Sequence, residues 1–117
     1  MKLPVGEGLL RTKFRDYQRH SREKHGEEIK MSFEEYSEIV KRPCFYCGDQ
    51  PPMCELRACR PNNGPCYAHG MDRIDNNIGY HKDNCVSCCT TCNSMKSKML
   101  TSVFLDKVRK IFSIHGG

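Results

Sequence analysis

The sequence predicts a small α+β domain that is held together by a bound metal ion. Its 117 residues suffice for one domain, hydrophobic residues make up 38% of the chain and tryptophan is absent, so the apolar core should be thin. Two Cys-x-x-Cys pairs, Cys44/Cys47 and Cys89/Cys92, have the spacing of zinc knuckles, because two intervening residues let both sulfurs face one ion. Helical periodicity at both ends and short strand-like runs between the pairs supply the remaining elements.

The first predicted helix spans residues 9–25. Leu10, Phe14 and Tyr17 recur at helical spacing, and charged residues occupy most of the remaining surface. Gly26 is a helix terminator of the usual kind.

A second helix is predicted to begin at Ser32. Ser32 and Glu35 have the spacing of a capping box, in which each side chain bonds the backbone N–H of the other residue. Pro43 ends this helix just before the first cysteine pair. We expect residues 1–43 to form a basic helical extension packed on the metal-binding part. The apolar stripe of the second helix consists of Phe33, Tyr36, Ile39 and Val40.

The central segment is predicted to be a hairpin followed by a short helix. Residues 48–68 are rich in Pro, Gly and Asn, which favours turns. Residues 67–74 and 84–87 can form two strands, and the loop at 75–79 consists mainly of turn-forming residues. The short helix should span residues 93–98, within a core domain of residues 44–99.

The last helix is predicted within residues 100–117, which should complete one globular unit. Thr101 or Ser102 can cap its start. Its periodicity predicts an inward-facing stripe that consists of Phe104, Leu105, Val108, Ile111 and Phe112.

The nine cysteines favour a metal site over a disulfide scaffold. Their number is odd, the first residues contain no apolar stretch of the signal-peptide type, and the two pairs have metal spacing. We therefore expect structural Zn²⁺ and an intracellular protein, in the cytoplasm of a host cell. No stretch of the chain is apolar enough to span a membrane. The expected zinc ligands are Cys44, Cys47, Cys89 and Cys92.

The other five cysteines are open to more than one interpretation. Cys85 and Cys88 form a further C-x-x-C, but we expect them to be small buried side chains of a strand. Cys54, Cys59 and Cys66, with or without His69, could bind a second zinc ion in the long segment between the two main pairs.

The charge distribution suggests a polyanionic partner. Nineteen Lys and Arg residues against fourteen Asp and Glu give a net charge of +5, and the basic residues cluster near both ends. Such clusters suit a phosphate backbone, although solvated helix faces explain each cluster equally well. The residues expected to contact DNA are Arg11, Lys13, Arg15, Arg19, Arg22, Lys96 and Lys98.

Three segments together resemble one enzyme family. They read Gly-Met-Asp-Arg-Ile-Asp-Asn-Asn-Ile-Gly-Tyr at 70–80, Asp-Asn at 83–84, and Cys-Cys-Thr-Thr-Cys-Asn-Ser-Met-Lys at 88–96. The pattern resembles the HNH endonucleases of phage type. The resemblance covers about half the chain and implies a ββα-metal (HNH/His-Me finger) core with a zinc site of four cysteines, flanked by N-terminal helices and a C-terminal helix.

The resemblance also implies a second metal ion. HNH enzymes use one hard divalent cation, Mg²⁺ or Mn²⁺, to polarise the scissile phosphate. Asp72 and Asn93 match the positions that bind this ion in the family. Asn84 matches a residue that braces the loop between the two strands; an ordinary Asn at a strand edge is the competing interpretation.

One position departs from the family pattern. The residue after the metal-binding Asp is usually the His that acts as general base, and here it is Arg73, which cannot accept a proton at neutral pH. Arg73 could instead hold the phosphate. The candidate bases are His69, His81 and Asp75, and a metal-bound water could also lose its proton without a protein base.

The sequence therefore predicts a metal-dependent DNA endonuclease, of the kind encoded by phages or mobile elements, which nicks DNA or cuts both strands. The alternative is an HNH-fold zinc module with weak or no activity that binds nucleic acid or protein. The protein is expected to act as a monomer or a dimer. If Asp72 is a ligand of the catalytic ion alone, Asp72→Ala should abolish cleavage and leave the fold nearly intact.

Overall fold

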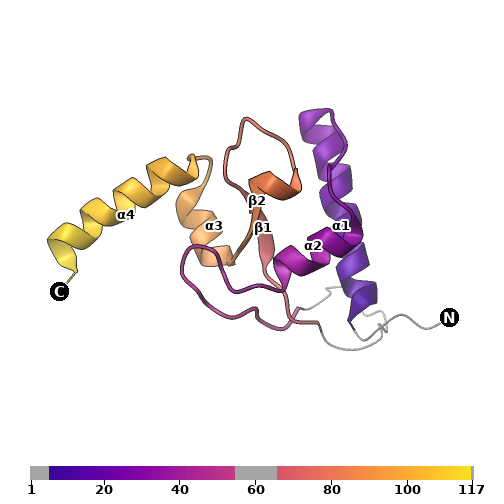
Figure 1. Ribbon diagram of the computed structural model, residues 1–117, viewed down its shortest axis with the longest axis horizontal. Helices are drawn as coiled ribbons and strands as arrows, with labels where there is room; N and C mark the ends of the chain where they lie inside the picture. Colours follow the sequence, from indigo (N-terminus) through magenta and orange to yellow (C-terminus); the bar gives the residue numbers. More distant parts are fainter. Residues whose placement is uncertain (1–5, 55–65, 117) are drawn as a thin grey trace.

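A computed structural model of the protein describes residues 6–54 and 66–116 (Figure 1). The described part is a small α+β structure with four α-helices and a two-stranded sheet, as the sequence predicts at this level. The elements in chain order are α1 (Glu7–His20), the π-helical turn η1 (Ser21–His25), α2 (Phe33–Val40), β1 (Gly70–Arg73), the 3-10 turn η2 (Lys82–Asn84), β2 (Cys85–Cys88), α3 (Thr90–Lys96) and α4 (Thr101–His115).

The predicted N-terminal helix is present, but its last turn is not α-helical. Leu9, Leu10 and Phe14 are buried on one face of α1, as their spacing predicts. Ser21–His25 then form a π-turn, and Gly26 ends the helix in the left-handed conformation with φ of 67°.

The capping box of α2 is confirmed. The backbone N–H of Glu35 donates to Ser32 Oγ (3.1 Å), and the backbone N–H of Ser32 donates to Glu35 Oε1 (2.8 Å). The apolar face of α2 packs against α1, where the rings of Phe14 and Tyr36 lie 5.1 Å apart. Both helices share one hydrophobic core with the hairpin, because Met71 and Cys85 belong to the same buried cluster.

The two strands form an antiparallel hairpin shorter than the one predicted. β1 begins at Gly70 instead of Tyr67, and Asn84 lies in η2 instead of the second strand. The register pairs Asp72 with Val86. Tyr17 joins the hairpin to α1, since the backbone N–H of Met71 donates to the Tyr17 hydroxyl (2.9 Å).

The helix after the hairpin begins three residues earlier than predicted. Cys89 is its N-cap, and the Cys89 sulfur accepts a hydrogen bond from the Cys92 N–H (3.3 Å). Cysteine is not among the preferred N-cap residues, so the sequence alone does not indicate a helix start at Thr90.

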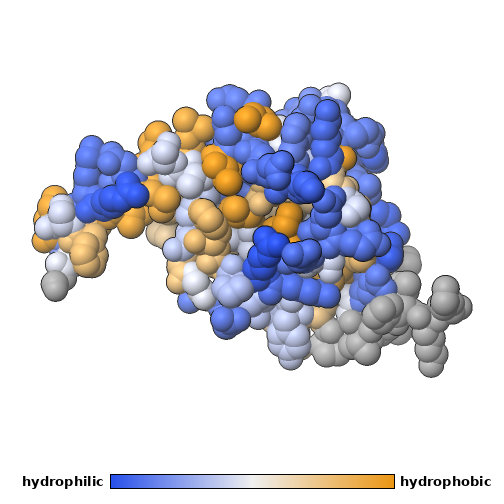
Figure 2. All heavy atoms as spheres, viewed as in Figure 1, coloured by the Kyte–Doolittle hydropathy of each residue, from blue (hydrophilic) through white to orange (hydrophobic). Residues whose placement is uncertain are grey.

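The predicted packing of α4 is wrong over most of its length. The helix begins after Leu100 without a side-chain cap, so neither Thr101 nor Ser102 caps it. Phe104 is buried, whereas Val108, Ile111 and Phe112 are exposed, with 68% of Phe112 accessible. The helix extends away from the remaining elements, and hydrophobic and hydrophilic side chains alternate over its surface (Figures 1 and 2). Its apolar stripe therefore has no surface to cover within the described residues.

Among residues 6–54 and 66–116, no helix combines the length and the apolar character needed to cross a membrane.

Candidate functional site

Four cysteine thiols from the two predicted knuckles form one cluster. The Sγ atoms of Cys44, Cys47, Cys89 and Cys92 all lie within 4.8 Å of one another, and those of Cys47 and Cys89 are 3.7 Å apart. A tetrahedral zinc site with bonds of about 2.3 Å has sulfur–sulfur edges of about 3.8 Å. The cluster can therefore hold a metal ion such as zinc with little rearrangement.

Backbone N–H groups favour the thiolate form of Cys44, whereas burial and the neighbouring thiols raise the pKa of Cys92. The N–H of Cys89 donates to Cys44 Sγ (3.4 Å), and Gly48, with φ of 81°, closes the first knuckle through its N–H bond to the Cys44 carbonyl (2.9 Å). Burial would raise the pKa of Cys44, but backbone N–H groups of Cys47, Cys89 and Tyr46 outweigh it and lower the pKa to about 6. A thiolate is the form that binds zinc.

Cys85 and Cys88 are buried, as predicted. Both lie in β2, and burial raises the pKa of each thiol to about 12, so they are inert apolar groups. All eight cysteines that the structure describes are free thiols.

The described residues do not form the second zinc site. Cys54 Sγ donates to the Ala68 carbonyl (3.5 Å), and the Nε2 atom of His69 lies 2.8 Å from the Asp49 carbonyl. Within 6–54 and 66–116, the four-thiol cluster is the one group of metal-binding side chains, and Cys59 lies outside the described residues.

A second site lies beside the hairpin, in a pocket of about 540 Å³. The end of β1 and the second half of α3 both line it, so that Asp72 and Asn93, which are 21 positions apart, share one cavity. Side chains from the N-terminal helix and from the loop after β1 complete its wall. The lining includes His25, Asp72, Arg73, Tyr80, Asn93 and Lys98.

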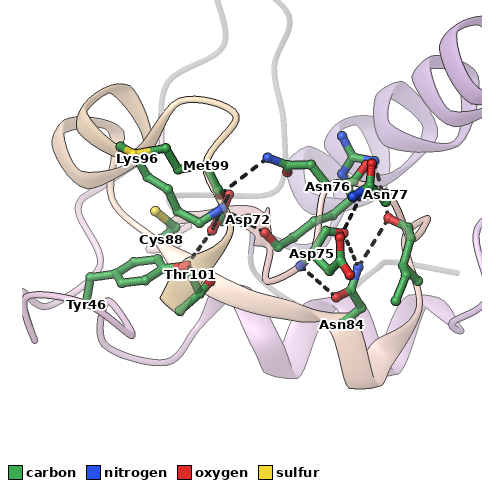
Figure 3. A network of polar contacts seen from close by, with 12 residues as sticks. Tyr46, Asp72, Asp75, Asn76, Asn77, Asn84, Cys88, Lys96, Met99 and Thr101 are labelled. Atoms are coloured by element: carbon green, nitrogen blue, oxygen red, sulfur yellow. Dashed lines mark hydrogen bonds and ion pairs between the residues drawn. The ribbon is translucent and has the colours of Figure 1, made fainter. Parts of the chain in front are cut away.

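Asp72 is buried, and neighbouring side chains contact both of its carboxylate oxygens (Figure 3). Its Oδ2 accepts a short hydrogen bond from the Tyr46 hydroxyl (2.6 Å) and lies 3.1 Å from Lys96 Nζ, while Oδ1 lies 3.3 Å from the same ammonium group. Tyr46 in turn accepts a hydrogen bond from Thr101 (2.7 Å). One oxygen thus has both of its lone pairs engaged, and Oδ1 retains one.

Lys96 is wrongly predicted as a DNA contact. Its side chain is 0% exposed, pairs with Asp72 and donates to the Arg73 carbonyl (2.9 Å). A buried ammonium needs such partners, because an unpaired charge in the interior is very costly. This lysine therefore fixes α3 against β1 and cannot reach a phosphate at the surface.

Asn84 braces the loop after β1, as the resemblance implies. Its Oδ1 accepts from the Asp75 N–H (3.0 Å), and its Nδ2 lies within hydrogen-bonding distance of the carbonyls of Asp75, Ile78 and Gly79 (3.0, 3.2 and 3.0 Å). The side chain is buried. It therefore has a structural role and does not line the pocket of Asp72 and Asn93.

The three candidate bases named from the sequence lie away from the pocket. His69 precedes β1 and contacts Asp49, His81 follows the loop, and Asp75 accepts the Asn77 N–H (2.9 Å) within its turn. None of these three described residues lines the cavity of Asp72 and Asn93. His69 and Asp75 do not share a strand with Arg73, because β1 begins after His69 and ends at Arg73.

Arg73 occupies the pocket wall. Its guanidinium carbon lies 5.1 Å from the centre of the Tyr80 ring, and Nη1 donates to the carbonyls of Asn76 (3.2 Å) and Ile78 (3.3 Å). These contacts hold the guanidinium in place at the wall, and the Arg73 side chain remains partly accessible from the pocket.

The predicted DNA contacts on α1 and η1 differ in availability. Arg11 pairs with Glu7 (3.0 Å) and lies 4.1 Å over the Phe33 ring, so part of its side chain is used within the fold. Arg15, Arg19 and Arg22 are exposed, and Lys13 is half-buried. Hydrophilic side chains cover the α1 side of the molecule (Figure 2).

Sequence reasoning missed Tyr46 and His25 as members of this site. Tyr46 lies within the first cysteine pair and bonds to Asp72 across 26 positions of sequence. His25 reaches the pocket from the N-terminal helix. No short-range spacing connects either residue to the hairpin, so no local pattern could have identified them.

Comparison with known proteins finds one viral relative at significant similarity. The chain is 34% identical over 80 residues to an uncharacterized protein of Acanthamoeba polyphaga mimivirus. The matched region is 68% of this chain and 13% of the viral protein. No protein-family model matches the chain, and no solved structure matches it.

Proposed function

We propose that this chain is a metal-dependent DNA endonuclease of the HNH type, in which β1, β2 and α3 form the ββα-metal unit and zinc in the four-thiol cluster holds the fold. The observation that carries the proposal is the shared pocket of Asp72 and Asn93, the two residues that the family resemblance assigns to the catalytic ion. The viral origin of the relative agrees with a phage- or mobile-element-encoded enzyme.

The residues of the pocket fit a hydrated divalent cation. Asp72 Oδ1 retains a lone pair, and the exposed Asn93 side chain offers an amide oxygen from the facing helix. Mg²⁺ characteristically keeps several waters and binds through one or two carboxylates together with substrate phosphates. Asp72 and Asn93 would hold such an ion, which would polarise the scissile phosphate and stabilise the leaving oxygen.

The charges around the pocket favour a phosphate. Asp72 is the one carboxylate among the described lining residues, whereas Arg73 and Lys98 line the pocket and Lys96 lies against Asp72. Three cationic groups against one carboxylate leave a net charge of +2 without any ion. A phosphodiester is attracted by this charge and supplies the anionic oxygens that a divalent cation requires. Cation and DNA should therefore bind cooperatively.

Two observations favour the second candidate, a zinc module that binds nucleic acid without cleaving it. Lys96 already neutralises Asp72, and Arg73 stands where the family has its general base. Such a module would use the same positive pocket for phosphate binding alone.

A plasmid-nicking assay in Mg²⁺, Mn²⁺ or EDTA separates the two candidates. The enzyme should nick supercoiled plasmid with Mg²⁺ or Mn²⁺ and stop in EDTA. Asn93→Ala removes an exposed ligand and should lower cleavage about 100-fold or more, on the scale found when a catalytic group is removed. Ser94→Ala, an exposed neighbour that does not line the pocket, is the matched control.

Binding of DNA with no metal-dependent cleavage would establish the second candidate. Equal nicking by wild type, Asn93→Ala and Ser94→Ala would refute the proposed metal site.

A further inference from the structure

The pocket contains a histidine that lies outside the hairpin and α3. A nuclease of the proposed type needs a group that accepts a proton from the attacking water, and Arg73 cannot do so near neutral pH. His25 lines the same cavity as Asp72 and Asn93. We propose that His25, supplied by the N-terminal helix, is the general base of this site; this inference rests on the proposed function.

Local structure aims His25 at the pocket. A π-turn contains about one more residue than an α-turn, so its last residue, His25, is displaced by about one helical position relative to a continuous α-helix. Ser21–His25 form this turn, and Ser21 Oγ donates to the Glu27 carbonyl (2.6 Å) to hold the end of the helix.

The segment after His25 is attached directly to the loop of the hairpin. The backbone N–H of Lys30 donates to the Tyr80 carbonyl (2.8 Å), and the Glu27 side chain lies so close to Gly79 that a Cβ there would collide with it. These contacts fix the end of the N-terminal helix relative to the pocket wall.

Aromatic contacts define where the imidazole lies. The His25 ring is 6.2 Å from the Tyr80 ring and 5.6 Å from the His20 ring. Arg73 stacks on the same Tyr80 at 5.1 Å. His25 and Arg73 therefore both border Tyr80, which places a proton acceptor beside a phosphate-binding group.

The surroundings keep the imidazole in the form that a base requires. Partial desolvation and the positive charges of Arg73 on β1 and His20 on α1 lower the pKa of His25 below its usual 6.5, against an opposing contribution from Glu27. Lys98 and Asp72 also face the cavity. His25 is exposed, so it can return its proton to solvent.

The proposed step balances without another reactant. An imidazole nitrogen of His25 accepts a proton from water as the water oxygen bonds to phosphorus. The bond between phosphorus and the 3′ oxygen breaks, and that oxygen takes a proton from solvent. His25 then releases its proton to solvent.

The test compares His25→Gln with His115→Gln, which replaces an exposed histidine on α4. Cleavage of plasmid in Mg²⁺ is measured from pH 5.5 to 8.5, together with zinc content and DNA affinity. His25→Gln should lower kcat/KM by at least about 100-fold at pH 7.5 with zinc and affinity unchanged. It should also remove the acidic limb of the wild-type profile, whose midpoint should fall below 6.5 because the pKa of His25 is lowered. Free imidazole should partly restore cleavage to His25→Ala.

Suppose that Asn93→Ala loses cleavage while His25→Gln retains both cleavage and the acidic limb of the pH profile. This result would overturn the assignment of His25 alone. Absence of metal-dependent cleavage in the wild type would overturn the proposed function, and this inference with it.

Discussion

The four-thiol cluster and the Asp72 pocket both depend on α3, yet they are built differently. Cys92 of α3 completes the cluster, whose members come from two short pairs and are organised by backbone N–H groups. Asn93 of the same helix lines the pocket and Lys96 pairs with its carboxylate, while other lining residues come from the N-terminal helix and from β1. The first site is a local arrangement repeated twice, and the second exists only when three distant segments pack together.

This difference predicts different failures. Loss of a cluster ligand should remove the folding energy that an ion supplies. Loss of a pocket residue should lower the stability of the fold if it leaves a buried partner unpaired. A residue that only faces the cavity should be lost at little cost in stability.

The largest expected effect is loss of zinc. Cys92→Ser should abolish stoichiometric zinc binding and cooperative unfolding, since structural zinc supplies on the order of 10 kcal/mol and domains of this size have stabilities of about 5–15 kcal/mol. Metal analysis and a circular-dichroism melt measure both. Cys88→Ala, which removes a buried thiol outside the cluster, should retain zinc and lose roughly 1–2 kcal/mol. A Cys92→Ser protein with one zinc per chain and a wild-type melt would contradict the assignment.

A smaller but still large effect is expected for the Asp72–Lys96 pair. Asp72→Ala leaves the Lys96 ammonium buried without its carboxylate, so urea denaturation should show a loss of about 3–5 kcal/mol. This replaces the sequence-based expectation that the fold would be nearly unaffected.

A double variant tests whether the loss comes from the unpaired charge. Asp72→Asn with Lys96→Met removes both charges, and its stability should exceed that of either single variant. Losses that simply add in the double variant would show that the two side chains act independently.

The smallest effect is expected at the far end of α4, which belongs to neither site. Phe112→Ser should change the free energy of unfolding by no more than about 0.5 kcal/mol, because this side chain is 68% exposed. Phe104→Ala, in the same helix, should cost about 3 kcal/mol, since Phe104 is buried and its ring lies 5.4 Å from that of Tyr46. Equal thermal shifts in the two variants would contradict the description of α4.

The sequence predicted those features that depend on short spacings. Two residues between cysteines place both sulfurs on one ion, and the three-residue step from Ser32 to Glu35 is enough for a capping box. The hairpin followed by a helix was also recognised, with boundaries that differ by a few residues. Each of these patterns determines its structure locally, so little tertiary information is needed.

The features that were missed depend on tertiary packing. A lysine in a polar stretch of helix is normally solvated, and the burial of Lys96 follows only from the carboxylate and carbonyl that meet it across the fold. His25 required the π-turn of the preceding helix, for which the sequence has no clear signal. The apolar stripe of α4 was correctly recognised as periodic, but periodicity does not show whether a covering surface exists.

The buried contacts of the short helix α3 limit where residues can be inserted into this chain. Cys92 and Lys96 are one turn apart and both are buried, while Asn93 directly follows Cys92 and faces the cavity. An α-helix turns by about 100° per residue. One residue inserted after Asn93 would therefore rotate the Lys96 ammonium away from Asp72. One residue inserted between Cys92 and Asn93 would rotate both Asn93 and Lys96 out of alignment with the four-thiol cluster. We expect related sequences to vary in the loops and to keep the Cys-Asn-x-x-Lys interval constant.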